Sequence, residues 1–99
     1  MIKHIVLFKL KNFSDELSKI QKMAEIKGAL MGLLEKVEVL KSIEVGINSN
    51  PNEKFDISLS TTFDSMNDLH TYAGHPDHIA AGAIVREVME ERACVDYEV

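Results

Sequence analysis

The sequence predicts an α+β fold with its elements in the order β-α-β-β-α-β. Residues 2–10 are rich in β-branched and aromatic side chains, which is typical of a strand. Two separate stretches further along space their apolar residues as helices do. Between them, two strand-like segments flank a turn cluster at residues 48–52, so these segments are expected to form a hairpin.

The first strand, Ile2 to Leu10, is apolar on both faces at its centre. One face carries Ile2, His4, Val6, Phe8 and Leu10, and the other carries Lys3, Ile5, Leu7 and Lys9. A sheet with one face in water instead shows a clean alternation of apolar and polar residues. Something is therefore expected to cover each face of this strand.

The first helix is expected to begin after Ser14, which can cap it, and to run to about Val37. The second strand is predicted at Val39 to Ile47 and the third at Phe55 to Phe63. The third strand alternates apolar residues with serine, threonine and aspartate, so one of its faces is hydrophilic.

Ser65 is expected to cap a short helix that ends at Gly74, a residue type suited to helix C-termini. Pro76 suits the first turn of a further helix, predicted to reach about Glu91. Its inward residues are predicted to be Ile79, Ala83, Ile84, Val88 and Met89, and its solvated residues Arg86, Glu87, Glu90 and Glu91. Ala93 to Val99 closes the chain as a fourth strand.

This order is the split βαβ, or ferredoxin-like, signature, with a four-stranded antiparallel sheet. In this topology both helices pack on one face of the sheet and leave the other face open. Ile5 and Leu7 would make that face apolar, and pairing it with a second copy removes the exposed patch. A homodimer is therefore expected. The alternative is a monomer whose second face tolerates water, which the serines of the third strand favour.

Length and charge exclude several classes of protein. With 99 residues the chain is expected to be one domain, residues 1–99. The net charge of -5 disfavours nucleic acid and anionic membranes as partners. No apolar run is long enough for a membrane span. Lys9 and Lys11 follow the N-terminal apolar stretch where a signal peptide would be cleaved, so a strand fits better. A single cysteine, Cys94, indicates a reducing compartment, and we expect the cytoplasm.

The segment from Leu69 to His78 gathers one tyrosine and three of the four histidines around a Gly/Pro break. We hypothesise that His78 is a general base and that Tyr72 donates a hydrogen bond to a developing oxyanion. The positive end of the last helix would keep the His78 ring neutral. The alternative is that His78 braces the kink around Pro76.

His4 and His75 are the candidate substrate-binding residues. His4 shares a strand face with apolar residues, and the alternative for it is a hydrogen-bonded core histidine. His75 precedes a proline, which disfavours helical geometry, and its alternative role is to fix the loop.

No metal and no cofactor are expected. His4, His75, Asp77, His78 and Cys94 are plausible ligand types, but their spacing is not a zinc signature. Cys94 has no acid–base partner adjoining it in sequence. No glycine belongs to a phosphate-binding motif.

Three parts of the chain together resemble the stress-responsive A/B barrel (Dabb) domain family, over essentially the full length. They are the N-terminal strand, the Tyr72…His75-Pro76-Asp77-His78 segment and the ending Val95-Asp96-Tyr97-Glu98. The resemblance implies a dimeric α+β barrel, in which two ferredoxin-like sheets close around a shared interior.

A plant polyketide cyclase of the Dabb family uses a tyrosine and a histidine that match Tyr72 and His78, with a further histidine matching His4. That enzyme lines its pocket with aromatic residues from the first helix, whereas residues 21–27 contain none. The polyketide substrate is therefore not carried over to this chain.

Three functions follow from these observations. The first is a homodimer that binds a small, mainly apolar molecule near Tyr72 and His78. The second is an enzyme (a cyclase, lyase or isomerase) that uses this pair for proton transfer on a carbonyl compound. The third is a structural, stress-related dimer without a ligand.

Overall fold

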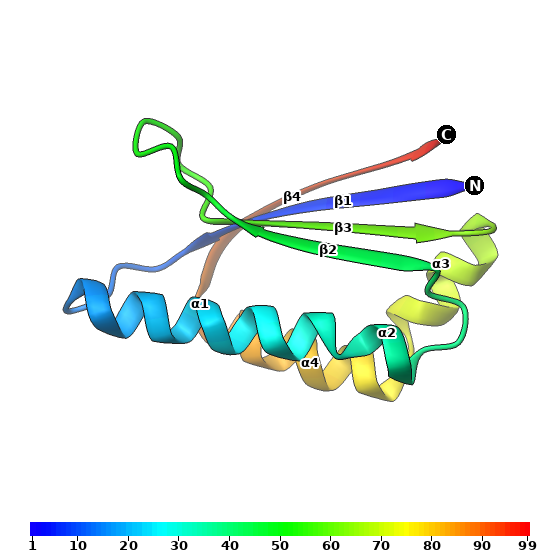
Figure 1. Cartoon of the computed structure of the whole chain (residues 1–99), viewed down its shortest axis with the longest axis horizontal. Helices are drawn as coiled ribbons and strands as arrows, with labels where there is room; N and C mark the ends of the chain where they lie inside the picture. The colour runs from blue at the N-terminus through cyan, green and yellow to red at the C-terminus, as the bar shows by residue number, and fades with distance from the viewer.

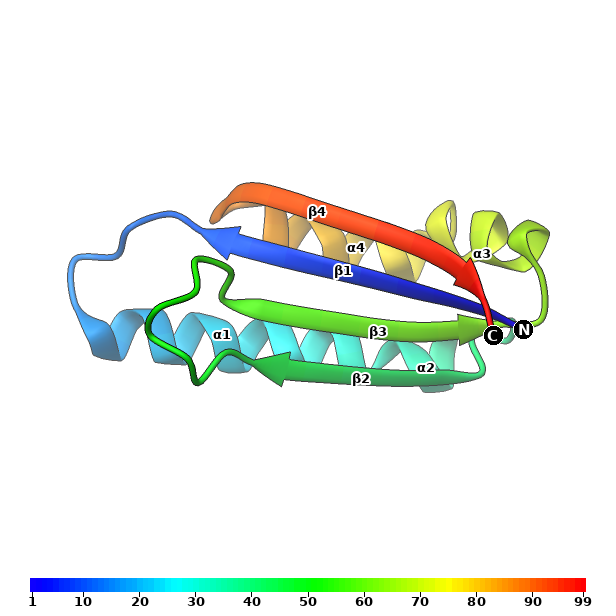
Figure 2. The same cartoon turned by 90° about the horizontal axis from the view of Figure 1, so that it is seen from above.

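A computed structural model describes residues 1–99 and contains one four-stranded antiparallel sheet with all helices on one side of it (Figures 1 and 2). The strands lie in the order β2-β3-β1-β4, so β1 occupies a central position between β3 and β4. The strands are β1 (Ile2–Leu10), β2 (Ser42–Ile47), β3 (Ile57–Phe63) and β4 (Met89–Glu98). The helices are α1 (Glu16–Met31), α2 (Leu33–Lys36), α3 (Met66–Ala73) and α4 (Pro76–Arg86). The predicted ferredoxin-like fold is confirmed.

The helix termini mostly follow the sequence signals. Ser65 caps α3 by accepting a hydrogen bond from the backbone N–H of Asp68, Gly74 follows its C-terminus, and Pro76 is the first residue of α4. The first helix is an exception, because Asp15 and not Ser14 is its N-cap; the Asp15 carboxylate accepts from the backbone N–H of Ser18. The predicted helix to Val37 is interrupted at Gly32, which separates α1 from α2.

The predicted boundary between the last helix and the last strand was wrong. The helix ends at Arg86 and not at Glu91, and β4 begins at Met89 and not at Ala93. The cause is pairing with β1: Met89 lies opposite Leu10, and Glu91 lies opposite Lys9. A run of charged residues is solvated in either a helix or a strand, so its sequence did not decide between them.

The inward face of α4 also differs from the prediction. Ile79 is 51% exposed and Ala83 is exposed, whereas Ala81 and Val85 are buried. Ile84, Val88 and Met89 pack against the core as predicted, so the prediction was wrong only in part. Arg86 is exposed, as predicted, although it also lines the cavity described below.

The two faces of β1 have different surroundings. His4, Val6 and Phe8 point toward the helices and are buried. Ile5 and Leu7 point to the opposite face, which no helix covers (Figures 1 and 2). The strand pairings place apolar residues of β4 beside them, and this uncovered apolar face consists of Ile5, Leu7, Ala93, Val95 and Tyr97.

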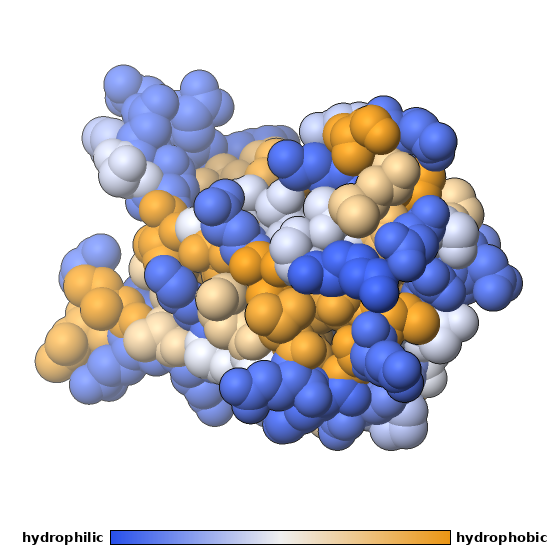
Figure 3. All heavy atoms as spheres, turned by 45° about the vertical axis from the view of Figure 1, so that its right-hand side comes forward, coloured by the Kyte–Doolittle hydropathy of each residue, from blue (hydrophilic) through white to orange (hydrophobic).

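Val95 on this face is 55% exposed. Apolar residues also reach the surface elsewhere, in a band between hydrophilic residues in the view of Figure 3. None of the helices has both the length and the apolar composition that crossing a bilayer requires.

Candidate functional site

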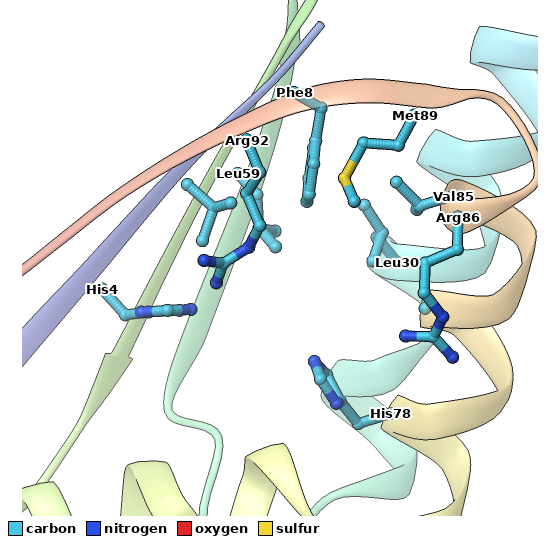
Figure 4. Close-up of a pocket in the computed structure, with 11 residues that line it drawn as sticks. His4, Phe8, Leu30, Leu59, His78, Val85, Arg86, Met89 and Arg92 are labelled. Carbon is cyan, nitrogen blue, oxygen red and sulfur yellow. The ribbon is translucent and has the colours of Figure 1, made fainter. Parts of the chain in front are cut away.

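A cavity of about 260 Å³ lies between the helix-facing side of the sheet and α4 (Figure 4). Its apolar lining comes from β1, α1, β3, α4 and the start of β4. The lining residues are His4, Val6, Phe8, Leu30, Leu59, His78, Gly82, Val85, Arg86, Met89 and Arg92. Imidazole and guanidinium groups therefore stand against an otherwise mainly apolar wall.

His4 is held by a carboxylate on the neighbouring strand. The pairing of β1 with β4 sets His4 opposite Asp96, and Nδ1 of His4 is hydrogen-bonded to the Asp96 carboxylate. Because a carboxylate only accepts, Nδ1 carries the proton in this pair. In the neutral form of the ring Nε2 is an acceptor, and Figure 4 shows the ring directed into the cavity.

His78 is the third residue of α4 and reaches the same cavity from the helix side. Its Nδ1 lies 3.0 Å from the backbone carbonyl of Ala73, which can only accept, so Nδ1 donates and Nε2 is the free acceptor. Burial is the main cause that lowers the pKa of His78, and positive charge at His4, Arg86 and Arg92 acts in the same direction, whereas the hydrogen bond to Ala73 opposes the shift. The ring is therefore neutral at neutral pH.

Tyr72 is 1% exposed and packs between two rings, with centroid distances of 5.0 Å to Phe63 and 4.4 Å to His78. Burial raises the pKa of its hydroxyl to about 12, so the group stays protonated. The hydroxyl is buried and has no hydrogen-bond partner in the protein. Tyr72 does not line the cavity itself but a neighbouring depression, which shares His4, His78 and Arg92 with it.

His75 and His70 lie away from the cavity lining. His75 is the N-cap of α4, where its Nδ1 accepts a hydrogen bond of 3.1 Å from the backbone N–H of Asp77. This is the loop-fixing geometry that its position before Pro76 favours. His70 is exposed on α3 and contributes only to the neighbouring depression.

The sequence did not reveal three residues of the site: Arg86, Arg92 and Asp96. Arg86 was interpreted as a solvated helix residue and is exposed, but it also lines the cavity. Arg92 was placed outside the final strand. Starting β4 at Met89 would have shown Arg92, Cys94 and Asp96 alternating onto one face. That pattern was the available signal.

His4, Cys94 and Asp96 form the group that could hold a metal ion, since their ligand atoms all lie within 4.8 Å of one another. The Cys94 sulfur lies 3.6 Å from Nδ1 of His4 and 3.7 Å from the Asp96 carboxylate. Nitrogen, sulfur and carboxylate ligands suit Zn²⁺. However, burial raises the pKa of the Cys94 thiol and so disfavours the thiolate ligand, and the His4–Asp96 hydrogen bond already accounts for two members of the group.

The fold and the site define an α+β domain with a histidine-containing cavity beneath a ferredoxin-like sheet. Residues 2–99 match the model of the stress responsive A/B barrel domain, Dabb. The chain belongs to the Dabb family.

Among the proteins that this chain resembles, one is of unknown function and two are named as enzymes. A dimeric protein of unknown function from Bacteroides fragilis is 47% identical, with a TM-score of 0.93 over 99% of this chain and 95% of that one. Olivetolic acid cyclase from Cannabis sativa is 26% identical over 97% of this chain and 94% of its own length. Hydroxynitrile lyase from Passiflora edulis is 17% identical, with a TM-score of 0.80 over 97% of this chain and 90% of that one.

The lowered pKa of His78 predicts a specific pH dependence of stability. The unfolded chain binds this proton more tightly than the folded one, because the folded pKa lies below the ordinary value of 6.5. The stability that the protein owes to neutral His78 is fully present above the unfolded pKa of 6.5. It is lost as the pH falls through the pKa of the folded protein. Between about pH 7.5 and about pH 5, the free energy of unfolding should fall more steeply for the native protein than for His78→Gln.

Urea unfolding at each pH measures this slope, and NMR of the His78 ring protons gives the titration midpoint directly. The same midpoint in the urea-unfolded chain is the reference. Equal slopes for the two proteins, or a folded midpoint at or above the unfolded one, would contradict the burial of this ring.

Proposed function

We propose that the protein is a homodimeric Dabb domain that binds a small, mainly apolar molecule in the cavity beside His78 and Tyr72. The observation that supports this proposal is the cavity itself, with an apolar wall and a few polar groups that converge on one space (Figure 4). Ligand sites in proteins combine these same two features.

The wall is formed by side chains that are themselves well packed. Val6, Leu30 and Leu59 are buried at the floor, and their positions are set by β1, α1 and β3. An apolar ligand gains about 25 cal/mol for each Å² that it removes from water there. The volume of about 260 Å³ lies just below the roughly 300–1,000 Å³ of common ligand pockets, so the ligand is small.

Filling the cavity should abolish binding. The backbone at Gly82 faces the cavity, and a Cβ there would meet only the flexible end of Arg86, at 3.1 Å. Gly82→Leu should therefore fold and occupy the space. Its matched control is Gly28→Leu on α1, where nothing lies within 4 Å of the added Cβ.

Neutral hydrocinnamamide serves as the probe, followed by NMR of the methyl groups of Leu59 and Val85. The native protein and Gly28→Leu should show saturable shifts, and Gly82→Leu should show none. If the native protein does not bind, or if Gly82→Leu binds as well as it does, the protein has no such site. Failure to bind would favour the structural, stress-related dimer over the ligand-binding protein.

The homodimer is proposed from the uncovered apolar face of the sheet. Contiguous apolar patches of this kind are rare on monomers and mark association sites. A second copy docked around a two-fold axis would cover the patch with an identical one. The Bacteroides fragilis relative, at 47% identity, is a dimeric protein, which supports the same arrangement here.

A charge on the sheet face should disrupt this association. Val95→Glu should shift the protein toward the monomer, because it would bury an unpaired carboxylate in the interface. Ile79→Glu on α4 is the matched control, since Ile79 is 51% exposed and Val95 is 55% exposed. Sedimentation velocity measures the mass of each. Dissociation by Ile79→Glu alone, or a monomeric native protein, would contradict the sheet-face dimer.

A second candidate function is proton transfer on a carbonyl compound, as in a cyclase, lyase or isomerase. A neutral His78 with a free Nε2 can accept a proton. The protonated Tyr72 hydroxyl has no hydrogen-bond partner within the protein, so it can donate to a substrate oxygen without breaking an existing bond. A relative in sequence, a cyclase, and a protein of similar fold, a hydroxynitrile lyase, are enzymes by name.

Exchange of the α-protons of benzylacetone for deuterium, followed by NMR, tests this candidate. His78→Gln should slow the exchange by about a hundredfold or more, the usual contribution of a positioned acid or base. Tyr72→Phe should also slow it without lowering the melting temperature, because the hydroxyl loses no hydrogen bond within the protein. Tyr97→Phe, on the sheet face, is the control. A native protein no faster than buffer would exclude the candidate for this ketone.

A further inference from the structure

Arg86 and Arg92 are the only arginines in the chain, and both line the cavity. They come from different elements, Arg86 from the last turn of α4 and Arg92 from the helix-facing side of β4. The strand register sets Arg92 opposite Phe8, which is why its side chain lies on the cavity side of the sheet.

Neither arginine forms a salt bridge, although the chain carries 16 acidic residues and a net charge of -5. Lysines of this chain do find carboxylates. Those in salt bridges are Lys9, Lys19, Lys22, Lys41 and Lys54. The two guanidinium groups at the cavity are therefore cations without an acidic partner, in a protein that has acidic residues in excess.

Arg86 has its place at the cavity because of a glycine one turn earlier. A Cβ at residue 82 would lie 3.1 Å from Nη1 of Arg86, so the guanidinium folds back over the bare backbone of Gly82. Figure 4 shows His4 and Arg92 on the sheet side and His78 and Arg86 on the helix side around the same space. Both arginines are close enough to His78 to act on its ionisation.

We propose, on the basis of the proposed ligand cavity, that its ligand is a small carboxylate with an apolar body, whose carboxylate is bound by Arg86 and Arg92. A guanidinium presents a planar pair of N–H donors that matches a carboxylate in a bidentate arrangement. The apolar body lies against Val6, Leu59 and their neighbours. Both arginines are exposed residues, so they bind the carboxylate at the solvent side of the cavity while the apolar wall holds the rest of the ligand.

Two probes of matched shape measure how the ligand's negative charge affects affinity: hydrocinnamate and its neutral amide, hydrocinnamamide. The two have nearly the same shape, and the amide is the probe that tests the cavity alone. Isothermal titration calorimetry at low ionic strength should give the acid about a tenfold or greater advantage, the value of one charge-assisted hydrogen bond. Moderate salt should reduce this advantage, because both arginines are exposed and an exposed ion pair is screened by salt.

Arg86→Gln and Arg92→Gln should each weaken binding of hydrocinnamate by about tenfold and binding of the amide much less, because the amide carbonyl accepts a hydrogen bond but carries no charge. The melting temperature of each variant shows whether it is folded. Lys36→Gln is the control, since it removes one positive charge from an exposed residue that lines no part of the cavity.

The outcomes separate this inference from the proposed function. Equal affinities for acid and amide, or equal losses in Lys36→Gln and the arginine variants, would overturn the carboxylate site while leaving the cavity as a ligand site. Binding of neither probe would overturn both. Loss of acid and amide together in a folded arginine variant would mean that the arginines shape the wall and do not bind the anion.

Discussion

The central position of β1 and the strict alternation of its side chains are the constraint on which the rest of the structure depends. His4, Val6 and Phe8 point toward the helices, and Ile5 and Leu7 point the other way. A slip of one residue would exchange the two sets. It would bring Ile5 and Leu7 under the helices and carry His4 away from Asp96. Core, cavity and uncovered sheet face are thus consequences of one register.

The same register explains how a site arises from residues far apart in the sequence. The pairing of β1 with β4 supplies a carboxylate for His4 and places Arg92 at the cavity. The turn at Gly74 and Pro76 starts α4 so that its third residue, His78, faces the sheet from below. Each imidazole has one nitrogen fixed by the protein and the other available to a ligand. The arginines add positive charge at the same place, and the apolar wall excludes water from part of it.

Much of the fold was readable from local signals. The strand pattern of residues 2–10, the Ser65 cap and the Gly74–Pro76 break each depend on neighbouring residues alone, and each was predicted correctly. The proximity of Tyr72 and His78 followed from their short separation. The alternating apolar residues of the last strand also indicated its face correctly, although the start of the strand was misplaced.

The remainder of the site depended on tertiary pairing. The bond between His4 and Asp96 joins the two ends of the chain, and no local pattern specifies it. Residues 87–92 read equally well as a solvated helix and as a strand, and only the edge of β1 decides between them. With the strand start misplaced, Arg92 was not recognised as a cavity residue. Arg86 was correctly predicted to be exposed, but its place in the cavity lining depends on how Ala81 and Val85 pack.

The central claim is that the fold presents the Nε2 atoms of two neutral imidazoles to one cavity as acceptors, because each Nδ1–H donates to an acceptor of the protein. Long-range nitrogen–proton NMR of the histidine rings, at a pH above their titration, measures the tautomer of each directly. The account predicts the Nδ1–H tautomer for His4 and for His78. The Nε2–H tautomer at either residue would contradict it, because that ring would then offer the cavity a donor and no free acceptor.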